Sequence, residues 1–240
     1  MTVAFGLLLG ANGGAQSGDI ALAVDDGTRV QPIARLVDGR WVSAAPCTSG
    51  DSSSTPGGRE RLVVSGGLVA NSVRAIGPGT PEWLRLAPAI GQAFERRERE
   101  ARLTTDRTAR APRAIDWIYA LDDSARRVYY FEASRRVPNA SDDVDADTDP
   151  PGTIRVAVAG FLHDGREGPV SIGTKSELRW EQDGRPAGPD RPDLTPLGAV
   201  RHGDLSVWVM KGQSGSSSWF TLYEVGDATR TVLTTRVSRC

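Results

Sequence analysis

Lysine, histidine, cysteine and methionine are all scarce in this chain of 240 residues. Of its 29 basic side chains only Lys175 and Lys211 are lysines, and there are two histidines, two cysteines and two methionines. The other basic residues are arginines, and alanine, glycine, valine and proline are frequent, which indicates a GC-rich bacterial genome. Because no Cys-x-x-Cys pair or Cys/His cluster is present, a structural zinc site is excluded.

The chain also lacks an excess of either charge, long apolar runs and phosphate-binding motifs. Its net charge is −1, whereas nucleic-acid-binding proteins carry a basic excess or stripe, so we expect no nucleic-acid partner. No run approaches the roughly 20 apolar residues of a membrane-spanning helix, so no integral membrane segment is expected. A glycine-rich phosphate loop between a strand and a helix is missing, and no bound cofactor is predicted.

The N-terminus has the pattern of the end of a signal peptide. An apolar run from Val3 to Leu9 is followed by small residues, with Gly13 and Ala15 at the −3 and −1 positions of a cleavage site. The basic region that begins such peptides is missing, so residues 1–15 are predicted to be a truncated signal peptide whose start codon lies upstream. The alternative is a buried first strand. Export would place the mature protein in the periplasm or outside the cell.

The two cysteines agree with export. Cys47 lies in a polar loop and Cys240 is the last residue. A terminal cysteine is not explained by burial in a core, and an oxidising compartment favours a disulfide between the two. The alternative is a pair of unrelated thiols.

From Ile20 onward, short strands alternate with turn signals. Asp-Gly-Arg recurs at 38–40, 164–166 and 183–185, and Asp-Gly suits the positive φ angles of a type I′ hairpin turn. In "IRVAVAGF" (154–161) both alternating sets are apolar or small, which predicts a central strand covered on both faces. The chain is therefore predicted to be mainly β, with antiparallel sandwich or barrel-like sheets and one peripheral α-helix.

The single helix is predicted from capping residues and a narrow apolar stripe. Thr80 stands in the N-cap position, and Pro81 follows it at the first helical position. Pro88 and Gly91 are expected to split this segment and to leave the main helix near 89–103. The stripe consists of Ile90, Ala93, Phe94 and Ala101.

An acidic connector at 139–152 is the most distinctive stretch of the chain. Asp143, Asp145 and Asp147 have the D-x-D-x-D spacing of a calcium loop. Such a loop also needs glycine at its sixth position and glutamate at its twelfth, and neither is present in the available registers. We therefore predict a solvated spacer that ends at two prolines, with weak calcium binding as the alternative.

The same connector bears on the number of domains. It divides the chain into 16–138 and 153–240, and tight pairing of strands across it is as consistent with the pattern as two separate domains. We predict a single β-rich domain over 16–240.

Serine-rich loops raise the possibility of a serine hydrolase. Ser52 lies in "GDSSS" and Ser214 in "GQSGSSS", but the nucleophile elbow needs G-x-S-x-G between a strand and a helix. A triad also needs a histidine base, and only His163 and His202 exist. Each lies beside an expected hairpin turn, where a solvated histidine is the ordinary explanation.

Three glutamates within expected strands are candidates for carboxylate catalysis. They are Glu132, Glu177 and Glu224. Glycoside hydrolysis uses a pair of carboxylates, one with a raised pKa. Glu132 has aromatic neighbours in its strand, namely Tyr130 and Phe131, and an outward-facing residue is the simpler interpretation.

The tryptophans are the largest apolar side chains of the sequence. Each is either buried in the hydrophobic core or exposed as a stacking surface for a glycan or a protein. We favour the core for most members. The six are Trp41, Trp83, Trp117, Trp180, Trp208 and Trp219. The function expected from the whole pattern is that of an exported, non-catalytic binding or interaction protein with an unknown protein or glycan ligand. The alternative is a secreted hydrolase with a Ser/His or carboxylate site that no motif reveals.

Overall fold

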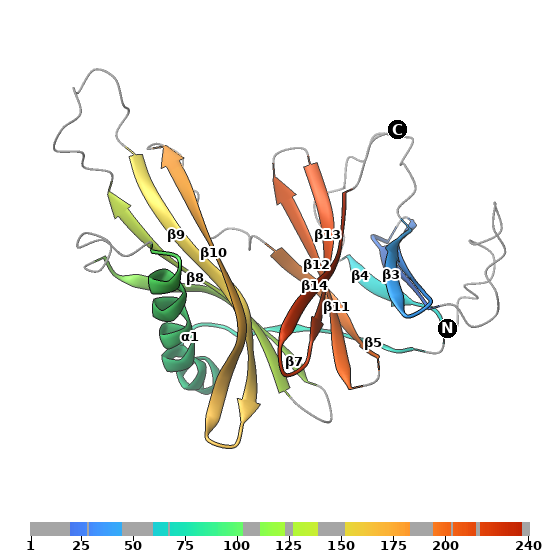
Figure 1. Ribbon diagram of the computed structural model, residues 1–240, viewed down its shortest axis with the longest axis horizontal. Helices are drawn as coiled ribbons and strands as arrows, with labels where there is room; N and C mark the ends of the chain where they lie inside the picture. The colour runs from blue at the N-terminus through green and yellow to red at the C-terminus, as the bar shows by residue number, and fades with distance from the viewer. Residues whose placement is uncertain are drawn as a thin grey trace. The chain divides into compact units, whose positions relative to one another are not determined.

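The computed structural model describes residues 20–27, 29–44, 60–66, 68–102, 111–122, 127–138, 152–182, 194–202, 204–214 and 217–236. These residues form three antiparallel sheets and a single helix, so the fold is mainly β as predicted (Figure 1). The chain divides into two compact units. Unit 2 is Val73–Asp193, and it is inserted between the two segments of unit 1, Met1–Ser72 and Leu194–Cys240.

Unit 1 contains two sheets from opposite ends of the chain. The first sheet has the order β3-β2-β1-β4, with β1 (Ala21–Asp25), β2 (Val30–Val37), β3 (Arg40–Ser43) and β4 (Arg61–Val64). The second has the order β14-β13-β12-β11-β5, with β5 (Ala70–Asn71), β11 (Leu194–His202), β12 (Leu205–Ser214), β13 (Ser217–Val225) and β14 (Thr229–Arg236).

The two sheets of unit 1 face each other across one hydrophobic core. Leu22, Ile33 and Trp41 come from the first sheet, and Val209 and Phe220 from the second. The sheets approach each other at both edges, where β3 lies near β14 and β4 lies near β11. At the first of these edges the hydroxyl oxygens of Ser43 and Thr235 are 2.8 Å apart. This is the predicted sandwich, with its edge strands protected by contact.

The tight turns agree only in part with the Asp-Gly-Arg pattern. Between β2 and β3, Asp38 has φ 49° and Gly39 has φ 72°, which are the positive angles of a type I′ turn. The repeat at 164–166 behaves differently, because Gly165 is still paired with Gly168 and the turn consists of Arg166 and Glu167. The repeat at 183–185 lies outside the described residues.

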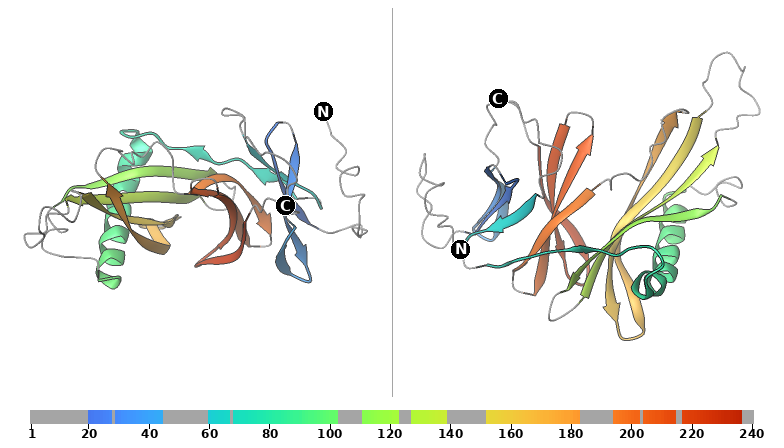
Figure 2. Two further views of the ribbon diagram at one scale, coloured as in Figure 1. Left: turned by 90° about the horizontal axis from the view of Figure 1, so that it is seen from above. Right: turned by 180° about the vertical axis from the view of Figure 1, so that it is seen from behind.

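Unit 2 is a five-stranded meander with the order β10-β9-β8-β7-β6. Its strands are β6 (Arg74–Ala75), β7 (Arg113–Asp122), β8 (Arg127–Pro138), β9 (Gly152–Gly165) and β10 (Gly168–Gln182). The helix α1 (Pro81–Glu100) packs against this sheet (Figures 1 and 2). Strands β8 and β9 pair directly across the acidic connector. The unit boundaries therefore fall near residues 72 and 193 and not at the connector, while the single-domain prediction stays a prediction.

Strand β9 confirms the expectation of a central, doubly covered strand. It lies between β8 and β10, and its residues from Arg155 to Leu162 are buried apart from the half-buried Ala159. One face, including Val158 and Leu162, belongs to the core beneath α1. The small residues of β9 allow close approach, since a Cβ added at Gly160 would lie 2.3 Å from the Gly173 carbonyl oxygen.

The helix is longer than the sequence predicted, because it spans Pro81–Glu100 and not 89–103. Thr80 is the N-cap, and its hydroxyl accepts a hydrogen bond from the Trp83 backbone N–H at 3.3 Å. Pro88 does not split the helix. It removes the hydrogen bond to the Leu84 carbonyl, but both residues are exposed, so water replaces the lost donor. None of the described residues forms a helix long and apolar enough to span a bilayer.

Candidate functional site

Glu132 is more deeply buried than Glu224, the other candidate glutamate whose side chain the structure describes. It lies in the middle of β8 with only 3 % of its surface exposed. The hydroxyl of Tyr130, two residues earlier on the same face, donates a hydrogen bond to its Oε1 at 2.7 Å. Phe131 points to the opposite face and joins the core beneath α1. The aromatic environment expected for Glu132 is therefore real, but only one of the two expected neighbours supplies it.

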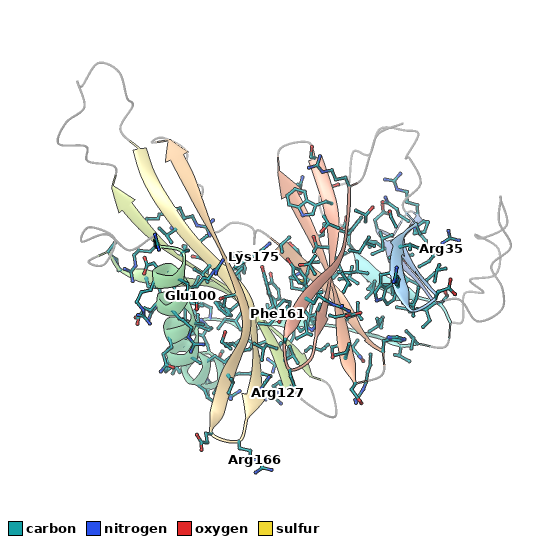
Figure 3. The ribbon with its side chains drawn as sticks, in the orientation of Figure 1. Arg35, Glu100, Arg127, Phe161, Arg166 and Lys175 are labelled. Atoms are coloured by element: carbon teal, nitrogen blue, oxygen red, sulfur yellow. The ribbon has the colours of Figure 1, made fainter. Side chains whose placement is uncertain are left out.

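Aromatic rings from three neighbouring strands surround this carboxylate. Tyr119, Tyr130 and Phe161 are register partners on β7, β8 and β9, and Phe161 is labelled in Figure 3. Their ring centroids are 6.5 Å and 5.3 Å apart in that order. Trp117 stacks on Tyr119 at 6.4 Å and an angle of 18°. Burial, followed by the negative charge of Glu132, raises the pKa of Tyr119 to about 12.

Within the described side chains of either unit, no second predicted glutamate accompanies Glu132 or Glu224 to form a carboxylate pair. Glu224 lies on β13 in unit 1, where it forms an ion pair with Arg230, whereas Glu132 belongs to unit 2. The side chain of Glu177 on β10 lies outside the described part of the chain. Among the described residues, no group of three or more His, Cys, Asp or Glu side chains has an arrangement that would hold a metal ion.

The serine and histidine candidates are also dispersed. His202 pairs with Leu205 beside the β11–β12 turn, and Ser214 stands at the other end of β12. Nine residues of extended strand separate Ser214 from Leu205, a distance of about 30 Å, so His202 does not act on Ser214. Ser52 lies outside the described residues.

His163 corrects one expectation. It was predicted to be a solvated turn residue, but only 9 % of its surface is exposed. The reason is that β9 continues through Asp164 and Gly165, so that His163 is an interior strand residue paired with Val128 and Val170.

Three further predictions lie outside the described residues. They concern the signal peptide at 1–15, the calcium alternative at Asp143, Asp145 and Asp147, and the disulfide between Cys47 and Cys240. Each stays a prediction.

The tryptophans divide between core and surface. Trp208 is fully buried and Trp41 is 7 % exposed, so both serve as core residues. Trp83 packs beside the core under α1, and the side chain of Trp180 is outside the described part. Trp208 and Trp219 lie on adjacent strands. They are on β12 and β13, but Trp208 pairs with Tyr223 and Trp219 with Gly212, so they do not meet.

Trp219 is the half-buried tryptophan of the second sheet of unit 1. Its indole ring lies against the backbone of Gly212 on the next strand, because a Cβ added to Gly212 would be 2.1 Å from the ring atom Cε2. On the other side, Trp219 pairs with Arg236 of β14. Leu194, paired with Gly212, completes the row across four strands. We call these four residues the Trp219 row.

The Trp219 row has two polar side chains, those of Trp219 and Arg236. The Arg236 side chain is exposed, and neither it nor the Trp219 indole N–H forms a hydrogen bond or an ion pair with any residue among those described. Sequence reasoning missed Gly212 and Arg236. The available signal was a glycine inside a strand, which marks a close approach of a ring or backbone, but the partner becomes known only from the strand register.

No family model, curated protein or solved structure matches this chain, so the functional argument depends on the geometry alone.

Proposed function

We propose that the chain is an exported, non-catalytic glycan-binding protein and that the Trp219 row is its contact surface. One observation carries this proposal. The indole of Trp219 lies against Gly212, and the exposed Arg236 occupies the paired position on the next strand. A flat aromatic ring beside an uncommitted planar donor is suited to a ring-shaped ligand with polar groups at its rim.

The chemistry expected at the Trp219 row follows from its parts. The C–H face of a pyranose stacks on the indole, which gives a large contact area for little loss of side-chain entropy, since the ring already lies in a fixed position. Arg236 donates to hydroxyl or carboxylate oxygens of the sugar. The indole N–H of Trp219 supplies one further donor.

A secreted hydrolase remains the second candidate, and the observation in its favour is the buried carboxylate of Glu132 among aromatic rings. A carboxyl in such an apolar position is suited to proton transfer. Glu132→Gln in a broad glycosidase screen tests this role. Hydrolysis by the wild type that the substitution abolishes would favour the enzyme, and absence of hydrolysis favours the binding protein.

Binding at the Trp219 row is tested with a glycan array followed by calorimetry on the best-bound glycan. Trp219→Ala should weaken binding at least about 30-fold, the loss expected for a central tryptophan. Gly212→Ala should have a similar effect, because the new methyl group displaces the indole without removing it. Arg236→Ala should weaken binding less.

Two controls match these substitutions. Gly77→Ala adds a methyl group where no atom lies within 4 Å, and Arg230→Ala removes another exposed arginine of β14. Both should bind like the wild type. A wild type that binds no glycan, or a Trp219→Ala variant that binds equally well, would overturn the proposal.

Export is part of the same proposal and has a separate test. Expression of the natural gene in a bacterial host should yield a mature chain beginning at Gln16, measured by intact mass. A mature protein that retains residues 1–15 in the cytosol would contradict it.

A further inference from the structure

The Trp219 row lies on a sheet face whose described charged residues are all basic. Phe220 and Leu222 of β13 belong to the core between the two sheets of unit 1. Trp219 is an odd number of residues from each, so its side chain lies on the opposite face. By the registers of β11 to β14, the charged residues described on this face are Arg201 and Arg236, and no described Asp or Glu lies on it.

The acidic residues described in this sheet and its connections lie at the other end. Glu224 is five residues from Trp219 along β13, about 17 Å, and forms an ion pair with Arg230. Asp204 lies between β11 and β12, and Asp227 between β13 and β14, so both are farther still from Trp219. Screening at physiological salt acts over about 8 Å, so these carboxylates do not offset a charge at the Trp219 row.

A further described carboxylate approaches the near end, and it is already neutralised. Oε1 of Glu60 lies 2.5 Å from Nζ of Lys211, the residue that precedes Gly212 on β12. The charge of this lysine is therefore balanced, whereas Arg236 forms no ion pair with any described carboxylate. Arg236 thus supplies the net positive charge beside the indole.

The polar members of this surface lie toward β14, which neighbours β13 (Figure 1). Arg236 and Thr234 are two residues apart on β14, so they lie on the same face, and both are exposed. Gly212 and Leu194, on the other side of Trp219, are apolar. A sugar ring stacked on the indole therefore finds its described side-chain donors toward β14.

We propose that the ligand of the Trp219 row is an acidic glycan, in which a uronic acid stacks on Trp219 and its carboxylate accepts hydrogen bonds from Arg236. The proposal rests on the proposed function, because it names the class of glycan bound at the same surface. Residues paired on neighbouring strands have Cβ atoms about 5 Å apart, so the guanidinium reaches the rim of a ring stacked on the indole. A uronic acid carries its carboxyl group directly on the sugar ring, which keeps the carboxylate at that rim.

A carboxylate suits this arginine better than a hydroxyl or a sulfate group does. The guanidinium is planar and donates two parallel hydrogen bonds to the two oxygens of a carboxylate. A sugar hydroxyl offers one neutral acceptor. A sulfate spreads its charge over three oxygens, of which one guanidinium contacts two at most.

Calorimetry on a matched pair of glycans tests the ligand class. The best-bound uronic acid oligosaccharide of the glycan array is compared with its methyl ester, which keeps the sugar rings and removes the charge. The wild type should bind the acid about fivefold more tightly than the ester, the effect of a partly exposed ion pair. High salt should reduce this preference and leave binding of the ester nearly unchanged.

Three variants separate the charge from the stacking. Arg236→Ala should bind the acid and the ester equally well. Arg236→Glu should prefer the ester, because its carboxylate repels that of the sugar. Trp219→Ala should weaken the binding of both forms to the same extent, since both stack on the indole. Arg230→Ala removes another exposed arginine of β14 and, as the control, should keep the preference for the acid.

The outcomes distinguish the ligand class from the proposed function. Neutral or sulfated glycans that bind more tightly than uronic acids, in a manner that Trp219→Ala abolishes, would overturn the acidic class and leave the glycan-binding surface intact. A preference for the acid that Arg236→Ala retains would overturn the role of Arg236. A wild type that binds no glycan would overturn the proposed function and the ligand class together.

Discussion

The carboxylate of Glu98 and the guanidinium of Arg135 face each other beneath α1, with Oε2 and Nη1 3.7 Å apart. Both side chains are deeply buried, with exposed fractions of 3 % and 7 %. The guanidinium also lies over the ring of Phe94, 5.5 Å from its centroid. Within the described structure, Oε1 of Glu98 has no hydrogen-bond partner. The contact neutralises two buried charges without the short hydrogen bonds of a strong ion pair.

This arrangement predicts a specific pH dependence of stability. Burial raises the pKa of Glu98 above its usual 4.5, and the charge of Arg135 opposes the shift only in part. The folded state then binds the proton more tightly than the unfolded state. The stability due to protonation is present below pH 4.5 and is lost as the pH rises through the raised pKa.

In the Glu98→Gln variant the side chain is neutral at every pH, so the loss of stability caused by deprotonation of Glu98 should disappear. In urea unfolding at a series of pH values, the free energy of unfolding of the wild type should therefore fall relative to that of Glu98→Gln as the pH rises above 4.5. Glu100→Gln removes a more exposed carboxyl from the same helix and should show no such difference. Parallel curves for Glu98→Gln and the wild type would refute the assignment.

Gly160 in β9 should tolerate no side chain. A Cβ there would lie 2.3 Å from the carbonyl oxygen of Gly173, a backbone atom that has no rotamer by which to move away. Gly160→Ala should lower the free energy of unfolding by about 1–3 kcal/mol, the range found for overpacked cores. Gly77→Ala, with no atom within 4 Å of its new methyl group, is the control and should change it by less than about 0.5 kcal/mol.

Two tyrosines, the buried Tyr129 and the half-buried Tyr119, should control unfolding at alkaline pH. Burial is the main cause that raises the pKa of both Tyr119 and Tyr129 to about 12. Their neutral forms stabilise the fold below pH 10, and this contribution is lost as the pH rises towards 12. Tyr119→Phe should therefore shift alkaline unfolding, followed by circular dichroism, to a higher pH.

Tyr129→Phe tests the hydrogen bonds of this tyrosine at neutral pH, where its phenol is uncharged. The Tyr129 hydroxyl donates to Asp164 at 3.0 Å and accepts from Arg85. The substitution should cost about 1 kcal/mol of stability at neutral pH, the usual net value of such contacts. Unchanged stability at neutral pH would show that the Arg85–Asp164 ion pair holds this end of α1 without the hydroxyl.

Local patterns predicted much of this fold because local physics determines it. The apolar residues of β9, the cap at Thr80 and the turn at Asp38-Gly39 each satisfy a rule that spans a few residues. The helix boundary was wrong because solvent exposure at Leu84 and Pro88, which makes the proline tolerable, depends on tertiary packing.

Long-range features were beyond such rules. The insertion of unit 2 depends on pairing between β5 and β11, more than a hundred residues apart in sequence, and no local pattern records it. The candidate site also depends on long-range strand pairing. A tryptophan was recognised as a possible contact, but its seat on Gly212 and its neighbour Arg236 depend on the registers of β12, β13 and β14.

The predicted disulfide gains a geometric argument from the edge of unit 1. Ser43 on β3 and Thr235 on β14 are in contact, with their hydroxyl oxygens 2.8 Å apart. Cys47 and Cys240 follow these residues by only four and five positions, and chain segments of that length reach about 14–17 Å. Segments of these lengths are long enough to allow the predicted bridge, and both cysteines themselves lie outside the described residues.

Peptide mass mapping of protein made in an oxidising compartment should find the Cys47–Cys240 bridge. Cys47→Ser and Cys240→Ser should each lower the free energy of unfolding by about 4 kcal/mol or less, since a long closed loop gives close to the largest entropic effect. The double variant should be no less stable than either single variant, because all three lack the same bond. Two free thiols in the folded, exported protein would contradict the bridge.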